Sequence, residues 1–270
     1  MVIIANKYKL LEKIGSGSFG EIYKGENIRT KELVAIKMEC LNTELSLLKN
    51  ESIKYNYLSK IKGIPSIKWF GKDNYYYFMV INLLGKSLKQ FFLENKTQYK
   101  YFSQKTIGEI GINMLHLVMN IHEKGLIHRD IKPDNFLFGL NDCNQLYLID
   151  FGFCKSYLKN DQHIPLKNTN KLIGSPNYAS VNAHKCIELS RRDDLESIGY
   201  ILLYLYNGKL EWEEIDFLEK NDKIILLKEN IITNCIPNFL REYFHQIRNL
   251  SFEETPNYKS LLNILSCERV

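Results

Sequence analysis

The sequence predicts an α+β fold of two lobes, with an antiparallel sheet and one main helix in an N-terminal lobe of about residues 1–84. The C-terminal lobe, about residues 85–270, is predicted to be mainly helical. Short segments with strand-like alternation run from Tyr8 to about Glu39. Helical hydrophobic spacing dominates the chain beyond Gly85. The 270 residues, 45% of them hydrophobic and 25% charged, suffice for a sizeable core or two lobes.

The N-terminal elements follow from local pattern. The segments "YKLLEKIG", "EIYKGEN" and "LVAIKMEC", with turn-type residues between them, predict a meander of antiparallel strands, and "YYYFMVINLL" (75–84) predicts another strand. Residues 43–62 have helical spacing, with Leu48, Tyr55 and Leu58 on one stripe. Glu51 shares that stripe. Since a buried carboxylate is costly without a cation, Glu51 predicts a nearby Lys or Arg.

Two helices define the C-terminal lobe. "SQKTIGEIGINMLHLVMNIHEKG" has apolar residues at helical intervals, with Ser103 as the expected N-cap and Gly125 as the stop. "RRDDLESIGYILLYLYNG" is apolar nearly all round from Ile198 to Tyr206, which predicts a buried central helix. We expect a ligand site in the crevice between the two lobes.

Composition excludes several function classes. The net charge of +5 fits an anionic ligand without requiring nucleic acid, and no alternation of basic and aromatic residues suggests RNA binding. No apolar run reaches 18 residues and no secretory signal is present. The six scattered cysteines indicate neither a zinc site nor a disulfide framework, and we expect core thiols. These features predict an intracellular, most simply cytoplasmic protein without nucleic-acid or membrane partners. We further expect a monomer, although these features do not bear on that.

The glycine pattern of "IGSGSFGEI", Gly15-x-Gly17-x-x-Gly20, suits a backbone that folds tightly against a phosphate. The same spacing is the dinucleotide fingerprint, and Glu39 lies where an acidic ribose ligand is expected. A dinucleotide site needs a helix directly after the third glycine. "EIYKGENIRTKELVAIKME" instead alternates like strands around a turn, which favours a glycine-rich β-hairpin lying over a nucleotide.

The second strand after these glycines adds a cation. Ala35 and Lys37 share a face by two-residue alternation, so a small residue beside an adenine could accompany a lysine that reaches the phosphates. Lys37 is also a candidate partner for Glu51. The alternative is a surface lysine that protects an edge strand.

Two later loops, "HRDIKPDN" and "LIDFG", supply the remaining groups that phosphoryl transfer needs. This reaction requires an acid near the attacking hydroxyl, a divalent metal that bridges phosphate oxygens, and cations for the developing charge. Asp130, Lys132, Asn135 and Asp150 are residues of those types.

Taken together, these motifs resemble a eukaryotic protein kinase over essentially the whole length: the glycine loop, the Val34–Lys37 strand, the His128–Asp130 loop and Asp150-Phe151-Gly152 occur in order. More narrowly, "KIGSGSFGEIYKGENI", "HRDIKPDNFLFGL", "DFGFCKSY", "QHIP" and "SRRDDLESIGY" resemble the casein kinase 1 family. As in that family, the usual Ala-Pro-Glu is absent, and "YASVNAH" stands in its place.

The resemblance implies one bilobal protein kinase domain over residues 1–270 that uses ATP and Mg²⁺. It implies that Asp130 orients the substrate hydroxyl, that Lys132 neutralises the transferred phosphate, and that Asn135 and Asp150 hold magnesium. Asp194 would brace the catalytic loop. The implied ATP-binding residues are Ile14, Gly15, Ser16, Gly17, Ser18, Phe19, Gly20, Ile22, Ala35, Lys37, Glu51, Ile81, Asn82, Leu83, Leu84, Leu137 and Ile149.

The resemblance also implies protein substrates phosphorylated on Ser or Thr, with acidic or already phosphorylated residues nearby. Asn177 stands where the family has a basic residue for that phosphate, so the need for priming is expected to weaken. Arg129, Lys155 and Lys223 are the remaining candidates for an anion site. The alternatives are a pseudokinase that binds nucleotide and acts as an interaction module, and a kinase of small molecules, which would lack the docking segment between Gly152 and Ser180.

Overall fold

A computed structural model describes residues 2–17, 20–41, 47–96, 102–233 and 236–266 of the chain. It contains two compact units. The first comprises Met1–Lys86 and Leu137–Gly152, and the second comprises Ser87–Phe136 and Phe153–Val270. The chain therefore returns to the first unit after residue 136, a feature that the predicted division near residues 84 and 85 did not include.

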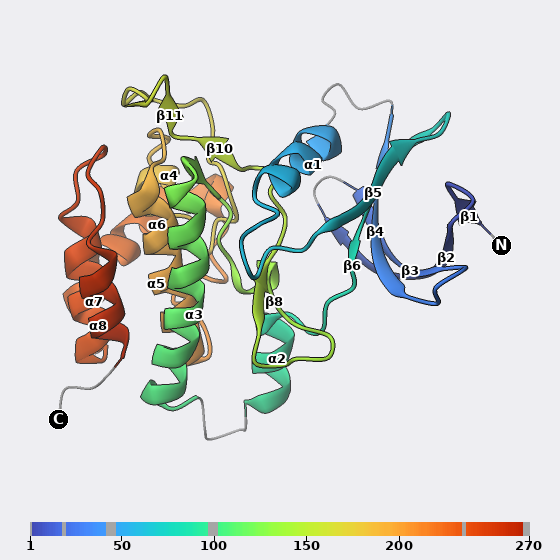
Figure 1. Ribbon diagram of the computed structural model, residues 1–270. Coiled ribbons are helices and arrows are strands. Elements are labelled where there is room, and N and C mark those ends of the chain that lie inside the picture. The colour runs from blue at the N-terminus through green and yellow to red at the C-terminus, as the bar shows by residue number, and fades with distance from the viewer. Residues whose placement is uncertain (1, 18–19, 42–46, 97–101, 234–235, 267–270) are drawn as a thin grey trace. The chain divides into compact units, whose positions relative to one another are not determined.

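The first unit is built on a curled antiparallel sheet (Figure 1). All neighbouring strands pair antiparallel, which confirms the predicted meander. In spatial order the strands are β1 (Ile3–Ile4), β2 (Tyr8–Gly17), β3 (Gly20–Asn27), β4 (Leu33–Cys40), β6 (Tyr76–Asn82) and β5 (Ile67–Lys72). One face buries a cluster of Ile4, Tyr8, Val34, Ile36, Phe78 and Val80.

Helix α1 (Leu47–Tyr57) is the one helix of the first unit in the described ranges. It is shorter than the predicted 43–62. Residues 42–46 lie outside the described ranges, and beyond Tyr57 the chain turns through Gly63, whose φ of 90° favours glycine. The predicted stripe is confirmed, because Leu48, Tyr55 and Leu58 are all buried.

The returning segment of the first unit forms a second, short hairpin. Strands β8 (Phe136–Phe138) and β9 (Leu146–Leu148) pair with each other, and Asp150 follows β9 by two residues. The amide of Gly85 donates to the carbonyl of Phe138 (2.8 Å), and the amide of Leu148 donates to that of Gly63 (2.9 Å). These backbone bonds fix the hairpin on the first unit.

The second unit is mostly helical, as predicted. Its helices are α2 (Leu88–Asn95), α3 (Gln104–Glu123), α4 (Val181–His184), α5 (Arg191–Asn207), α6 (Phe217–Glu229), α7 (Asn238–Arg248) and α8 (Tyr258–Leu265), with 3-10 turns η1 (Pro133–Asn135) and η2 (Asn230–Thr233). Its short strands are β7 (Leu126–Ile127), β10 (Lys155–Ser156), β11 (Leu158–Lys159) and β12 (Gln162–His163).

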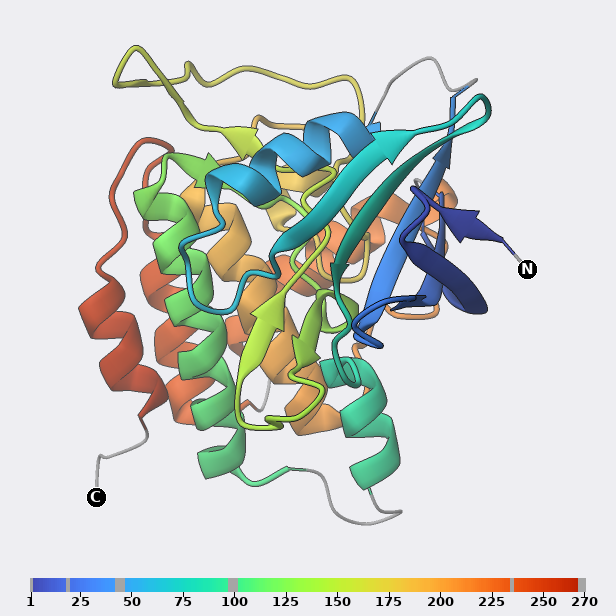
Figure 2. The same cartoon turned by 45° about the vertical axis from the view of Figure 1, so that its right-hand side comes forward.

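Helix α5 is the centre of this unit, and α3 and α7 pack against it (Figures 1 and 2). It is buried from Asp193 to Leu205, which confirms the predicted central helix. The hydroxyl of Ser103 accepts from the Thr106 amide at the start of α3, and Gly125 follows the helix with a φ of 74°. The predicted cap and stop of α3 are thus confirmed.

Candidate active site

The glycine motif forms the β2–β3 hairpin of the first unit. Gly15 pairs with Ile22, and Gly17 pairs with Gly20, so the chain continues after the third glycine as a strand. This contradicts the dinucleotide alternative, which needs a helix there. Gly20 has a φ of 139°, and a Cβ at that position would lie 1.9 Å from the Met38 carbonyl oxygen, so only glycine fits. Ser18 and Phe19 lie outside the described residues.

Lys37 meets two carboxylates within the first unit. Its Nζ lies 2.7 Å from Glu51 Oε2 on α1 and 3.1 Å from Asp150 Oδ1 after β9. Glu51 is 1% exposed and Lys37 is 8% exposed. Lys37 is therefore the cation that was predicted to accompany the buried Glu51 carboxylate. The alternative, a surface lysine at a sheet edge, is wrong.

Burial dominates the electrostatics of this pair. It raises the pKa of the Glu51 carboxyl to about 7, against the attraction of Lys37, which lowers it. Burial also lowers the pKa of Lys37, but Glu51 and Asp150 outweigh it and leave that pKa above its ordinary value. Lys37 is thus held as a cation beside Glu51. The Asp150 side chain, at 24% exposure, is the more exposed of the two carboxylates that Lys37 contacts.

The candidate adenine-binding residues belong to the same unit. Ala35 on β4 lies directly opposite Ile81 on β6, and the antiparallel pairing of these two strands fixes the positions of both residues. The other apolar candidates are Ile14 and Ile22 in the hairpin, Leu137 on β8 and Ile149 after β9; Ile14 is 49% exposed. Leu83 and Leu84 follow β6 as extended chain.

The side chain of Asn82, at the end of β6, bonds to the protein itself. Its Oδ1 accepts from the amide of Ser66 (2.9 Å) and from the Ser66 hydroxyl (2.8 Å). The side chain therefore ties β6 to the segment before β5.

Tyr55 of α1 holds Asp150 from the other side. Its buried hydroxyl accepts from the Asp150 amide (3.1 Å), and its ring meets Phe151 edge-on at 4.9 Å. Asp150 has a φ of 65°, a conformation rare for a residue other than glycine. The hydroxyl thus stabilises a strained backbone at the carboxylate beside Lys37. Sequence reasoning placed Tyr55 in the core but gave no sign of this bond.

We expect Tyr55→Phe to lower the free energy of unfolding by about 1–3 kcal/mol, because the buried Asp150 amide loses its acceptor. ATP binding in the presence of Mg²⁺ should weaken several-fold, since Asp150 is less firmly fixed. Thermal unfolding and nucleotide titration measure both. Tyr57→Phe is the matched control, because Tyr57 is on the same helix and 58% exposed. Equal behaviour of the two variants would remove Tyr55 from this role.

The loop that carries His128, Arg129 and Asp130 lies in the second unit, between β7 and β8, and Asp194 of α5 braces it. The buried Asp194 carboxylate accepts from the amides of His128 (2.7 Å) and Arg129 (2.8 Å) and from His122 Nε2 (3.0 Å). Burial pushes its pKa up, but these contacts hold the pKa of Asp194 below its ordinary value. The expected bracing contacts are present, and they fix Arg129 at a φ of 69°.

Asp130 is buried within a network of donors. The Ser175 amide and hydroxyl both donate to its Oδ1 (2.8 Å each), and Lys132 Nζ lies 2.7 Å from its Oδ2. The same ammonium donates to Ser175 Oγ (3.0 Å). Asp130, Lys132 and Ser175 thus form one compact cluster. Asp130 and Lys132 are among the residues that the sequence indicated, whereas Ser175 belongs to none of those motifs.

Asn135 lies beside this cluster in η1. Its Nδ2 donates to the Asp130 carbonyl (2.8 Å), which leaves the amide oxygen as the atom that a cation would use. Asn135 and Asp150 both offer oxygen ligands, the type that Mg²⁺ prefers. Their chemistry therefore fits magnesium.

The three cations suggested for an anion site have separate surroundings. Arg129 Nε donates to the Phe153 carbonyl (2.7 Å), and Lys155 Nζ lies 2.8 Å from Glu188, whose side chain is 2% exposed. Lys223 is exposed on α6. Lys155 is already paired with a buried carboxylate of the protein, so an anion would have to compete with Glu188 for it.

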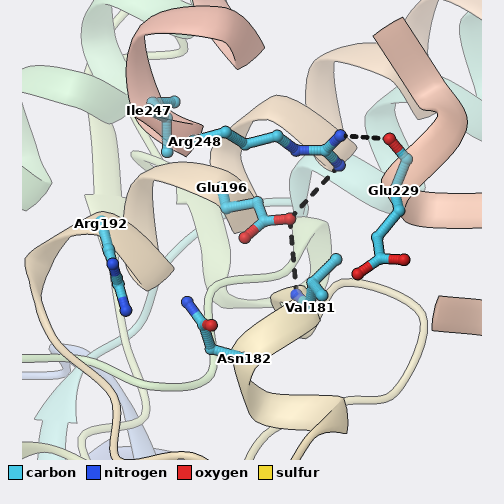
Figure 3. A pocket seen from close by; sticks show the side chains of 7 residues that line it. All are labelled: Val181, Asn182, Arg192, Glu196, Glu229, Ile247 and Arg248. Atoms are coloured by element: carbon cyan, nitrogen blue, oxygen red, sulfur yellow. Dashed lines mark hydrogen bonds and ion pairs between the residues drawn. The ribbon is translucent and has the colours of Figure 1, made fainter. Parts of the chain in front are cut away.

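The segment that replaces Ala-Pro-Glu uses a carboxylate from α5. Glu196 accepts from the Val181 amide (3.4 Å) and the Tyr200 hydroxyl, and lies 3.6 Å from Arg248 of α7. Figure 3 shows Val181, Glu196 and Arg248, which are among the residues that line a cavity of about 290 Å³. Asn182, which stands in place of the usual glutamate, instead donates to Asp193 Oδ1 (3.0 Å). The sequence motifs did not indicate that Glu196 takes this place.

His184 of α4 is a buried histidine. Burial and the neighbouring Lys228 ammonium lower its pKa from 6.5 to about 4. A lowered pKa means that the unfolded chain binds more protons between about pH 4 and 6.5, so this residue destabilises the fold as the pH falls through that range. At neutral pH the imidazole is uncharged.

Replacing His184 by Gln should therefore make the free energy of unfolding depend less on pH between 6.5 and 4. Denaturant unfolding at several pH values measures this slope. His116→Gln, at an exposed position of α3, is the control and should leave the slope unchanged. Parallel curves for the wild type and His184→Gln would contradict the assignment of a neutral, buried imidazole.

None of the helices in the part of the chain that the structure describes is long and apolar enough to cross a membrane. A comparison with protein families matches residues 8–267 to the protein kinase domain. That match spans the sheet with Lys37, the helix with Glu51, and both loops that carry Asp130 and Asp150. The chain therefore belongs to the protein kinase family.

Proposed function

We propose that the chain is a serine/threonine protein kinase of casein kinase 1-like type, which transfers the γ-phosphate of ATP to protein hydroxyls. The observation that carries this proposal is the cluster of Asp130, Lys132 and Ser175. It combines a buried carboxylate with a lysine two residues later in the chain, the arrangement that the sequence resemblance associates with serine/threonine specificity.

In this reaction the substrate hydroxyl oxygen forms a bond to the γ-phosphorus while the bond from that phosphorus to the bridging oxygen of ADP breaks. Asp130 accepts or orients the hydroxyl proton. Lys132 stabilises charge on the transferred group, and Lys37, fixed by Glu51, binds the α- and β-phosphates. Asn135 and Asp150 would hold Mg²⁺, which neutralises phosphate charge when bound.

A panel of peptides tests residue class and context together. The peptides carry Ser, Thr or Tyr as the acceptor, with Ala, Asp or phosphoserine three positions upstream. We expect phosphorylation of Ser and Thr but not Tyr, and faster reaction with Asp or phosphoserine than with Ala. Phosphorylation of the Tyr peptide alone would overturn the serine/threonine assignment, and equal rates for the three upstream residues would overturn the acidic preference.

Asn177→Arg should shift the preference toward phosphoserine-primed peptides. Trp212 Nε1 donates to the Asn177 carbonyl (2.8 Å), so the backbone that carries the new guanidinium is fixed. A charge-assisted contact contributes roughly 1.5–3 kcal/mol, so the ratio of kcat/KM for primed to unprimed peptide should rise about 10- to 100-fold. Asn177→Gln is the uncharged control. An unchanged ratio in Asn177→Arg would refute the role given to position 177.

A further inference from the structure

We propose that Lys228 is a positioning residue for the protein substrate, because its buried ammonium fixes the segment Ser175–Ser180 beside Asp130. This inference rests on the proposed kinase function. Lys228 lies on α6, distant in sequence from every motif used above. Its relative exposure is 0%, and it is among the largest fully buried side chains in the described part of the chain.

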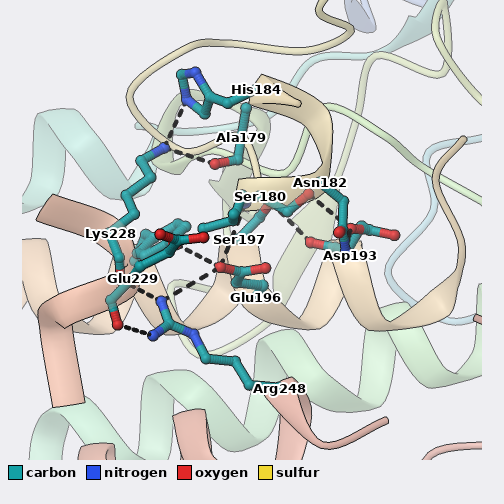
Figure 4. Close-up of polar contacts among 12 residues, drawn as sticks. Ala179, Ser180, Asn182, His184, Asp193, Glu196, Ser197, Lys228, Glu229 and Arg248 are labelled. Carbon is teal, nitrogen blue, oxygen red and sulfur yellow. Dashed lines mark hydrogen bonds and ion pairs between the residues drawn. The ribbon is translucent and has the colours of Figure 1, made fainter. Parts of the chain in front are cut away.

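The side-chain nitrogen of Lys228 has three polar neighbours. It donates to the Ala179 carbonyl (2.6 Å) and lies 3.0 Å from His184 Nε2 (Figure 4). It also donates to the Pro176 carbonyl (2.9 Å). His184 Nδ1 lies 2.6 Å from Asn221 Oδ1. His184 Nε2 also lies 2.9 Å from the Pro176 carbonyl oxygen, so His184 and Lys228 meet at the same carbonyl. Lys228 thus joins both ends of a short stretch of backbone.

Two aromatic rings complete the surroundings of this ammonium. Its Nζ lies 4.6 Å from the ring centroid of Tyr200 and 5.1 Å from that of Trp212. Trp212 also donates to the Asn177 carbonyl, between the two carbonyls that Lys228 holds. Lys228 and Trp212 together therefore bind the carbonyls of residues 176, 177 and 179.

The same segment is attached to the catalytic cluster at one end and to α5 at the other. Ser175 bonds to Asp130 and Lys132, as described above, and the Ser180 hydroxyl donates to Asp193 Oδ1 (2.7 Å). Movement of residues 176–179 would therefore shift the backbone next to Asp130. A bound peptide that approaches Asp130 would meet this backbone, so its position affects where the acceptor hydroxyl lies.

A buried lysine is weak evidence for a stabilising role. Methionine fills a similar volume without the cost of removing an ammonium from water, and such replacements of buried charges are often neutral or stabilising. Lysine supplies what methionine cannot, namely donors for the carbonyls of Pro176 and Ala179. This favours a role in holding the carbonyls over a role in filling the core.

The test compares Lys228→Met and Lys228→Gln with the wild type. Met removes every donor, whereas the Gln amide retains two. We expect Lys228→Met to raise the KM for peptide roughly tenfold or more, from the loss of charge-assisted hydrogen bonds, with the KM for ATP unchanged. Gln should restore part of the loss. Lys259→Met, the same change at an exposed position of α8, should match the wild type.

Hydrogen exchange gives a readout that does not depend on phosphate transfer. In Lys228→Met without substrates, the amides of residues 175–181 should exchange faster, while those of α3 should not. A wild-type protein without kinase activity would overturn the proposed function. Faster exchange of residues 175–181 in Lys228→Met would in that case still support the role of Lys228 in fixing this segment. The role of Lys228 would be overturned by any of three results. These are a wild-type KM for peptide in an active Lys228→Met variant, unchanged exchange in that variant, and failure of both Lys228 variants to fold.

Discussion

Asp130→Asn is expected to lower kcat by about 10²- to 10⁴-fold, the range typical of lost general acid–base catalysis, and to leave the Kd for ATP nearly unchanged. The amide can still accept from Ser175 through its oxygen, so the loop should keep its shape. It cannot take up a proton from the hydroxyl, and its N–H₂ group would face the Lys132 ammonium, now 2.7 Å from Oδ2. The loss should therefore fall on the chemical step.

Asp134→Asn provides the matched control for this result. Asp134 lies in the same loop, is exposed, and its Oδ1 lies 3.5 Å from the Lys89 ammonium at the surface. We expect its kcat to equal that of the wild type. If Asp130→Asn phosphorylated peptides at the wild-type rate, Asp130 would not be the group that accepts or orients the proton.

Lys37→Met is expected to abolish most phosphate transfer and also to destabilise the first unit. Removal of one partner from a buried ion pair costs about 3–5 kcal/mol, because the other charge stays buried. Here Glu51 keeps Asp150 as a neighbour of like charge, which raises its pKa further. Steady-state kinetics and chemical denaturation measure the two effects.

The destabilisation should depend on pH in a defined direction. Burial already raises the pKa of Glu51 to about 7 from its ordinary 4.5, and the loss of Lys37 removes an interaction that lowers it. A raised carboxyl pKa means that the folded state holds a proton that the unfolded state has lost, so stability falls as the pH rises above 4.5. We therefore expect Lys37→Met to be less stable at pH 8 than at pH 6.

Two further variants decide whether the buried pair is responsible. Adding Glu51→Gln to Lys37→Met should remove most of this pH dependence, because no buried carboxyl remains on α1. Lys24→Met, which removes only the surface pair with Glu12, should leave both stability and transfer unchanged. A Lys37→Met variant with wild-type stability at pH 8 would contradict the account of a buried, charged pair.

Local pattern predicted most of the fold. The strands of the first 40 residues, the cap at Ser103 and the buried helix α5 depend on periodicity and on residues near in sequence, and these predictions are confirmed. The end of α1 and the return of residues 137–152 depend on tertiary contacts instead. Likewise Cys40 and Cys143, expected in the core, are exposed, because no local pattern fixed their burial.

In the candidate site, too, some contacts could be predicted from local sequence pattern and others depend on tertiary structure. The pairing of Glu51 with Lys37 was predictable, because a carboxylate on an apolar stripe needs a cation. Tyr55, Ser175 and Lys228 were not predictable, because each acts through a bond to a residue far along the chain or in an irregular segment. A hydroxyl or an amine carries no sign in the sequence of which backbone atom it will meet.

The most direct test of the central claim, that Asp130 and Lys37 serve one phosphate-transfer reaction, is a single-turnover assay with γ-labelled ATP, Mg²⁺ and a serine peptide. The account predicts label on the peptide serine in amounts equal to the ADP formed, with loss of this product in Asp130→Asn, in Lys37→Met and on chelation of Mg²⁺. A wild-type protein that binds ATP but leaves the peptide unlabelled would contradict it and would point to a pseudokinase.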